Sequence, residues 1–185
     1  MKKIFSFSLI LALVAFVISC KKEEANKLTQ FDIEYSSNLA IPSASITVTT
    51  PTTSVEFTTP NVPTQQATKF SAEGTAQNLI DQIKITKFNI SAVSSGTTSV
   101  NLDYLKSLTI YIKAAGVGEE IVATKSNIPT GSTSVSMDIT DTNIKNYIFK
   151  DNIQFRVLAI FDASAATDQT LKLDEKVHVS ATLLK

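Results

Sequence analysis

The stretch that decides the fold is Phe155-Arg156-Val157-Leu158-Ala159-Ile160-Phe161. Apolar side chains occupy every second position, which is the period of a β-strand, because successive residues point to opposite faces of a sheet. Leu158 and Ile160 make the other face apolar as well, and this is typical of a strand at the centre of a sheet. The stretch therefore predicts a central strand in a protein built from β-sheets.

The same two-residue period recurs along the chain. It appears in residues 31–35, 46–49, 55–57, 83–90, 108–112, 135–139 and 177–183, and turn-forming residues at 41–43, 94–96, 115–118 and 129–131 separate these runs. Within residues 83–90 the phase slips by one position, which predicts a β-bulge near Thr86 and Lys87. This spacing predicts an all-β fold, an antiparallel β-sandwich of eight to ten strands that is Ig/fibronectin-like or jelly-roll-like.

Two segments depart from the regular alternation. In residues 140–150, Ile144, Tyr147 and Ile148 recur at helical spacing, which predicts one short helix crossing between two strands. Residues 51–68 hold three of the five prolines, and proline is tolerated at the edge of a sheet. We expect an edge strand followed by a loop there, or a hinge between an N-terminal hairpin and the main sandwich.

The N-terminal residues have the features of a signal peptide. Lys2 and Lys3 form a positive start, and residues 4–18 are apolar apart from two serines. This run is shorter than the roughly 20 residues that a membrane-spanning helix needs. We therefore expect residues 1–19 to be removed from the mature protein.

The motif Val17-Ile18-Ser19-Cys20 closes this segment and contains the only cysteine of the chain. It resembles the lipobox of bacterial lipoproteins, which has an aliphatic residue three positions before the cysteine and a small residue directly before it. The resemblance implies that the Cys20 thiol receives a diacylglycerol group and becomes the new N-terminus. Two or more acyl chains give a stable membrane anchor. The alternative is an ordinary secretory signal that ends near a cysteine.

The residues after the cysteine resemble a second signal. Lys22-Glu23-Glu24 is similar to the surface-export signal of Bacteroidota outer-membrane lipoproteins, a lysine followed by two acidic residues. This implies display on the cell surface; the alternatives are a solvated linker and the periplasmic face of the outer membrane. Residues 82–185 loosely resemble the body of small β-sandwich lipoproteins of the same bacteria, through residues 87–90, 105–112, 147–151 and 155–157.

These features predict the organisation of the whole chain. We expect a signal peptide over residues 1–19, a lipidated N-terminus and tether over residues 20–27, and a single β-sandwich domain over residues 28–185. Lys and Arg together number 17, as do Asp and Glu. This balance disfavours a nucleic-acid partner held by phosphate neutralisation. One cysteine and one histidine cannot form an internal disulfide or a structural zinc site, and we expect no metal and no cofactor.

A few residues are candidates for chemistry. His178 lies between Val177 and Val179, so we expect it on the solvent face, and the chain has no Gly-x-Ser-x-Gly motif to partner it. Arg156 is expected to pair with an acid or to clamp a ligand anion, and Tyr111 to be a binding aromatic or an ordinary strand residue. Four acids are expected to form either a calcium site or a solvated rim: Asp162, Asp168, Asp174 and Glu175.

None of these candidates predicts a catalytic residue. We expect a non-enzymatic, lipid-anchored protein of the cell envelope that serves adhesion, ligand capture or envelope scaffolding and contacts a protein or glycan partner. The alternative is a periplasm-facing accessory subunit of an outer-membrane complex, which would dock its partner through an apolar patch.

Overall fold

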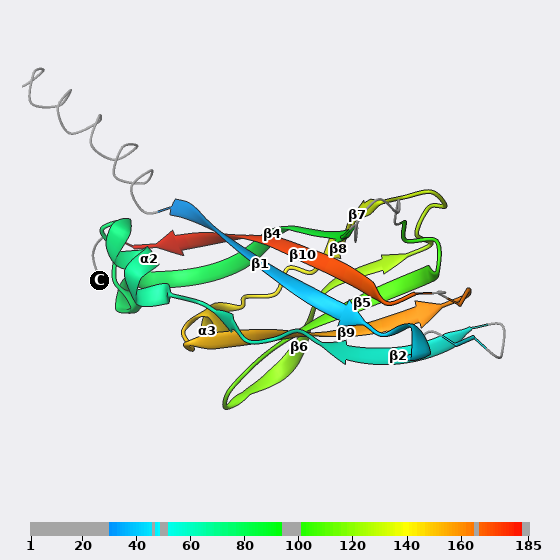
Figure 1. The fold of residues 1–185 in the computed structure, drawn as a ribbon. Coiled ribbons are helices and arrows are strands. Elements are labelled where there is room, and N and C mark those ends of the chain that lie inside the picture. Colours follow the sequence, from blue (N-terminus) through cyan, green and yellow to red (C-terminus); the bar gives the residue numbers. More distant parts are fainter. Residues whose placement is uncertain (1–29, 46, 49–51, 94–100, 165–166, 183–185) are drawn as a thin grey trace, which may run out of the picture.

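The computed structural model describes residues 30–45, 47–48, 52–93, 101–164 and 167–182. The predicted signal peptide, Cys20, the export-like signal at Lys22, Glu23 and Glu24, the tether and the turn at residues 94–96 lie outside the described residues. Ten strands in the described part form two antiparallel sheets that pack face to face around one apolar core (Figure 1). This confirms the predicted all-β sandwich.

The first sheet, sheet A, has the strand order β1-β10-β4-β7. Its strands are β1 (Gln30–Ile41), β10 (Gln169–Ala181), β4 (Ile80–Ala92) and β7 (Ser134–Ser136). The first and last strands of the fold are paired along the whole of β1, which begins with Gln30 opposite Ser180. Between β10 and β4 the register shifts where Thr86 is passed over, which confirms the predicted bulge.

The second sheet, sheet B, has the strand order β2-β9-β5-β6-β8, and β3 continues the line of β2 along β9. Its strands are β2 (Thr53–Thr58), β9 (Asn152–Phe161), β5 (Leu105–Ala114), β6 (Val117–Ser126), β8 (Asp138–Ile139) and β3 (Val62–Pro63). The fold-deciding stretch lies in β9, between β2 and β5, as predicted for a central strand. β2 is the predicted edge strand. Among the described strands β1 pairs with β10 in the other sheet, so β1 and β2 do not form an N-terminal hairpin.

Alternation decides which side chains enter the core. In β9 the odd-numbered residues from Ile153 to Phe161 are buried, whereas the even-numbered ones are partly exposed on the outer face, apart from the more exposed Asn152. The inward rings of Phe88 in sheet A and Phe155 in sheet B meet edge to face, with centroids 5.4 Å apart. This contact is part of the shared apolar core through which the two sheets pack.

The predicted crossing helix is α3 (Lys145–Ile148), which leads from β8 into β9. It is shorter than the predicted residues 140–150. The cause is Asn143, which forms a β-bridge with Lys84 and whose Oδ1 accepts hydrogen bonds from the N–H groups of Ile83 and Lys145. These contacts tie the preceding residues to β4 and delay the start of the helix.

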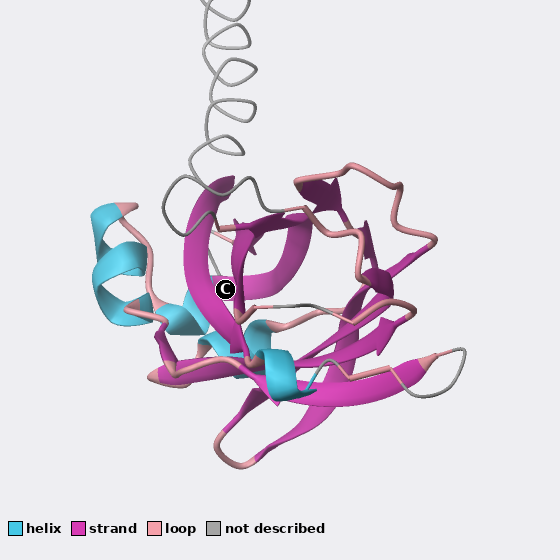
Figure 2. Ribbon diagram, turned by 45° about the vertical axis from the view of Figure 1, so that its right-hand side comes forward, coloured by secondary structure: helices cyan, strands magenta, loops and turns pink. Residues whose placement is uncertain are grey.

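A second helix, α2 (Gln66–Ala72), was not predicted from the sequence. Its Phe70 is buried and packs edge to face against Phe31 of β1 and against Phe149, which follows α3. Short 3-10 turns occur at Ser43–Ser45 and Gln77–Leu79. Figure 2 shows how small the helical part (cyan) of the described chain is beside the strands (magenta).

Candidate functional site

A cavity of about 750 Å³ opens at the end of sheet B where three segments meet. These segments are the β5–β6 hairpin, the connection between β2 and β3, and the connection from α3 into β9. The polar side chains of this end cavity come from Asn61, Lys113, Glu119, Lys150, Asp151, Asn152 and Gln154. Its apolar lining consists of small side chains, without an aromatic ring, from the hairpin. The hairpin itself confirms the predicted connection at residues 115–118, and its turn uses Gly116 at φ +71°.

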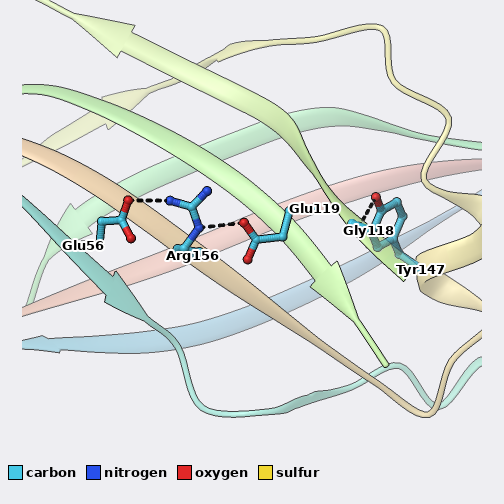
Figure 3. Close-up of polar contacts among 5 residues, drawn as sticks. All are labelled: Glu56, Gly118, Glu119, Tyr147 and Arg156. Carbon is cyan, nitrogen blue, oxygen red and sulfur yellow. Dashed lines mark hydrogen bonds and ion pairs between the residues drawn. The ribbon is translucent and has the colours of Figure 1, made fainter. Parts of the chain in front are cut away.

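An ion-pair cluster holds the hairpin wall of the end cavity (Figure 3). Arg156 extends from the outer face of β9, and its Nη1 lies 2.8 Å from Oε1 of Glu56 on β2. Its Nε lies 2.8 Å from Oε2 of Glu119, which lines the cavity. The guanidinium also lies 3.8 Å from the ring centroid of Tyr111 on β5. The prediction that Arg156 pairs with an acid is confirmed, and Tyr111 serves as the strand residue on which it stacks.

A hydrogen bond from α3 fixes the same hairpin. The Tyr147 hydroxyl donates to the backbone carbonyl of Gly118 at 2.6 Å (Figure 3). Burial of the ring, followed by the charges of Glu120 and Glu119, raises the pKa of Tyr147, so the hydroxyl keeps its proton and remains a donor. The hairpin is therefore held from two sides.

The opposite wall is fixed by a fully buried threonine. The Thr64 N–H donates to the Asp151 carbonyl at 2.9 Å, and its hydroxyl donates to the Lys150 carbonyl at 2.5 Å. The carbonyl of Thr64 in turn accepts a hydrogen bond from the Tyr35 hydroxyl at 3.1 Å. This chain of bonds positions the backbone that carries Lys150 and Asp151 before any ligand arrives.

Two cations of the end cavity have no partner within the part of the chain that the structure describes. Neither Lys113 nor Lys150 makes a side-chain hydrogen bond, ion pair or ring contact there, whereas Glu119 is already paired with Arg156. The side chains of Asn61 and Asn152 are likewise unpaired within the described residues. The lining provides ammonium, carboxylate and amide groups, and it contains no serine, cysteine or histidine.

His178 lies where the sequence predicted it, on the outer face of sheet A, while Val177 and Val179 are buried. Its Nδ1 is 2.8 Å from Oδ1 of Asp32 on β1. This hydrogen bond, together with one from Lys176, lowers the pKa of Asp32. His178 is thus part of a polar row across the strands, and it is remote from the end cavity.

The four acids predicted to cluster have four different environments. Asp168 accepts hydrogen bonds from the N–H and hydroxyl of Ser43, Asp174 pairs with Lys172, and Asp162 is exposed. Glu175 is buried, so the interpretation of all four as a solvated rim is wrong. Among the described residues, no group of three or more His, Cys, Asp or Glu side chains is placed to hold a metal ion.

The burial of Glu175 was not predicted from the sequence, which indicated either a calcium ligand or a solvated acid. Glu175 lies on the core face of β10, 3% exposed, opposite Tyr35 of β1 and Phe88 of β4. Neither carboxylate oxygen has a hydrogen-bond partner in the described residues. Burial first and the charge of Asp174 second raise the pKa of Glu175 to about 8, against the opposing effects of its own N–H and of Lys69.

A signal for this burial was present in the sequence. Leu171, Leu173, Val177 and Val179 alternate in one phase, and Glu175 occupies the middle position of that phase. Extending the last predicted strand backwards would have placed the carboxylate in the core.

Together the fold and the end cavity define an all-β sandwich with a polar cavity at one end. No family model matches the chain, and a comparison with curated proteins finds no match. Among the described helices, none has the length and apolar character needed to cross a membrane.

Proposed function

We propose that this chain is a lipid-anchored protein of the bacterial cell envelope whose β-sandwich binds a polar ligand without chemical turnover. The anchoring part is supported by the lipobox-like motif that ends at Cys20, the sole cysteine. The Lys22-Glu23-Glu24 signal supports display on the cell surface. A lipid anchor of two or three acyl chains holds a folded module at a bilayer without a spanning helix.

The observation that carries the binding part is the end cavity with its two unpaired lysines. Its volume of about 750 Å³ is within the range of roughly 300–1,000 Å³ that is typical of small-molecule sites. Its walls are fixed by Arg156, Tyr147 and Thr64, which lowers the entropy cost of binding. Unpaired cations and amides in a rigid, concave site are groups that a ligand can satisfy.

The anchor is tested by Cys20→Ser in the full chain. We expect the purified product to carry no lipid mass and to retain residues 1–19, because cleavage at a lipobox follows lipidation of the thiol. The matched control is Ser19→Ala, which keeps a small residue before the cysteine and should be lipidated and cleaved like the parent. A Cys20→Ser product with the mass and membrane fractionation of the parent would contradict the anchor.

Surface display is tested by protease treatment of intact cells. We expect the parent to be degraded, and a Lys22→Ala/Glu23→Ala/Glu24→Ala variant to stay lipidated but protected. Protection of the parent as well would place the domain on the periplasmic face.

A second candidate function is that of a periplasm-facing accessory subunit of an outer-membrane complex. The apolar side chains that it could use are Ile121 and Ile139, each 40% exposed, which lie on the adjacent strands β6 and β8 at positions opposite Tyr111 and Ala123. Mild crosslinking in cells followed by purification should then recover one stoichiometric membrane partner. An Ile121→Ser/Ile139→Ser variant should lose it, whereas a variant of the end cavity should keep it.

A further inference from the structure

The charges that line the end cavity are not equally available to a ligand. Glu119 points to Arg156, which neutralises it at 2.8 Å, whereas Lys113 and Lys150 have no partner in the described residues. Both lysines are partly buried, because their long side chains line the cavity. Of the charged groups still free there, two are cations and one, Asp151, is an anion.

We propose that the end cavity binds an anionic phosphate group carried by a hydroxyl-rich molecule, with Lys113 and Lys150 as the residues that recognise the phosphate. A lysine ammonium binds phosphate as a compact point charge with three donors. Two ammonium groups, one on the hairpin and one on the facing wall, bring positive charge to the site from two directions. This inference rests on the binding part of the proposed function, because it names the class of ligand that the end cavity takes. It does not depend on the lipid anchor.

The remaining polar groups match the rest of such a molecule. Asn61 and Asn152 offer amide donors and acceptors without partners in the described part of the chain, and Asp151 can accept from hydroxyl groups. An apolar or flat aromatic ligand would find no ring to stack on and would leave these groups unsatisfied. A polyhydroxylated phosphate, such as a sugar phosphate or a glycerol-phosphate headgroup, satisfies both the cations and the amides.

The place of the cavity in the fold makes a membrane headgroup one source of this phosphate. Phe31, at the start of β1, contacts Phe70, which contacts Phe149, the residue next to Lys150. These contacts place Lys150 toward the end of the sandwich at which β1 begins, and Figure 1 shows α3 at that end. Cys20 precedes Gln30 by ten residues, which reach at most about 35 Å when extended. A lipid anchor at Cys20 would keep this end near the headgroups, and a free sugar phosphate is the other source.

The test uses the full, lipidated chain purified in a non-ionic detergent and isothermal titration with three probes. These probes are glucose 6-phosphate, glucose, and phosphatidylglycerol carried in the same micelles. We expect saturable binding of at least one phosphate probe, and binding of glucose at least about tenfold weaker, because glucose lacks the charge. Binding should weaken with added salt. Tighter binding of glucose 6-phosphate would identify a free sugar phosphate as the ligand, and tighter binding of phosphatidylglycerol would identify a membrane headgroup.

The decisive variant is Lys113→Gln/Lys150→Gln, which should raise the Kd for the phosphate probe at least about tenfold. The matched control is Lys87→Gln/Lys106→Gln, which removes the same number of positive charges from exposed positions outside the cavity and should bind like the parent. Both variants change surface groups, and their melting curves verify folding.

Three results would overturn the proposal: no saturable binding of either phosphate probe up to about 10 mM, equal affinity for glucose, or equal weakening by the control pair. These results are independent of the anchor. If the Cys20→Ser experiment showed that the chain is not lipidated, phosphate binding by the cavity could still be measured. If the cavity bound no phosphate, lipidation of Cys20 could still be measured.

Discussion

Each sheet places one unusual charge near its middle, and the two sheets handle it in opposite ways. Arg156 points outward from β9 and is held by Glu56, Glu119 and the ring of Tyr111. Glu175 points inward from β10 and has no hydrogen-bond partner in the described residues. The outer charge is satisfied by opposite charges that are still in contact with water, whereas the inner one is most stable when it takes up a proton.

The difference shows that the environment of a charged side chain depends more on the face of the strand that carries it than on the position of that strand in the sheet. On an outer face, a charged side chain can pair with opposite charges on neighbouring strands, and solvent screens the charge that is left unpaired. On a core face the neighbours are packing residues, so the Glu175 carboxylate lies opposite Tyr35 and Phe88, and the charge of Lys69 only partly offsets the effect of burial. Arg156 therefore holds the wall of the end cavity, whereas we expect Glu175 to make stability depend on pH.

The largest effect is expected from Glu175→Met. Because the folded pKa of about 8 exceeds the ordinary value of 4.5, the folded state holds the proton more tightly, and the parent loses stability as the pH rises from about 4.5 to about 8. Above this window the free energy of unfolding of the Met variant should exceed that of the parent by on the order of 3 kcal/mol. Urea unfolding at a series of pH values measures it.

Glu175→Gln is the matched control for charge. It keeps an unsatisfied polar group in the core but cannot ionise, so its stability should be low and independent of pH across the same window. A parent whose stability is equally flat between pH 4.5 and pH 8 would refute the buried, unpaired carboxylate.

The next effect is expected from Arg156→Ala. Its loss leaves Glu56 and Glu119 without a cation and removes the stacking on Tyr111, which should cost about 1–2 kcal/mol of unfolding free energy. Arg156→Lys should recover part of this, because lysine keeps the charge without the planar fork. Thermal unfolding at low and high salt measures how much of the lost unfolding free energy is electrostatic. A loss that does not change with salt would show that packing alone is responsible.

A smaller effect is expected from Tyr147→Phe, which removes only the hydroxyl that donates to Gly118. We expect a loss of about 1 kcal/mol, because the freed carbonyl lies beside an open cavity and can be reached by water. Hydrogen exchange should show faster opening of the hairpin at residues 115–118. Unchanged exchange there would mean that Arg156 and Glu119 hold the hairpin without help from α3.

The smallest effect is expected from Asp32→Asn, in a pair that is partly exposed. His178 and then Lys176 lower the pKa of Asp32, so their contribution to stability is present above the ordinary pKa of Asp and is lost as the pH falls through the lowered value. Solvent screening limits it to about 0.5 kcal/mol. Chemical denaturation at neutral and acidic pH measures the loss, and a change above about 2 kcal/mol would show a coupling that the exposed geometry does not explain.

Part of the fold was predictable because its cause is local. The alternation around Val157 and Ala159 predicted the central strand, and the phase slip predicted the bulge at Thr86. The helix α2 was not predictable in the same way. Only Phe70 is buried among its seven residues, so no helical period appears, and its stability comes from the aromatic contacts with Phe31 and Phe149.

The candidate site was hidden from sequence reasoning for a different reason. Asn61, Lys113 and Lys150 lie in three separate segments, and they line one cavity only because β2, β5 and β9 are neighbours in sheet B. The sequence predicted that Arg156 pairs with an acid. Its partners are Glu56 and Glu119 because the strand order of sheet B places β2 and β6 on either side of β9 and β5.

The sequence by itself determined the two-residue period that makes this chain a β-sandwich, since that period expresses the geometry of a strand whatever surrounds it. It also carries the signal-like segment that ends at Cys20. Only the tertiary structure decided which charges are paired, buried or free. The energy of a charge depends on the groups within a few ångströms of it, and strands distant in the chain supply those groups.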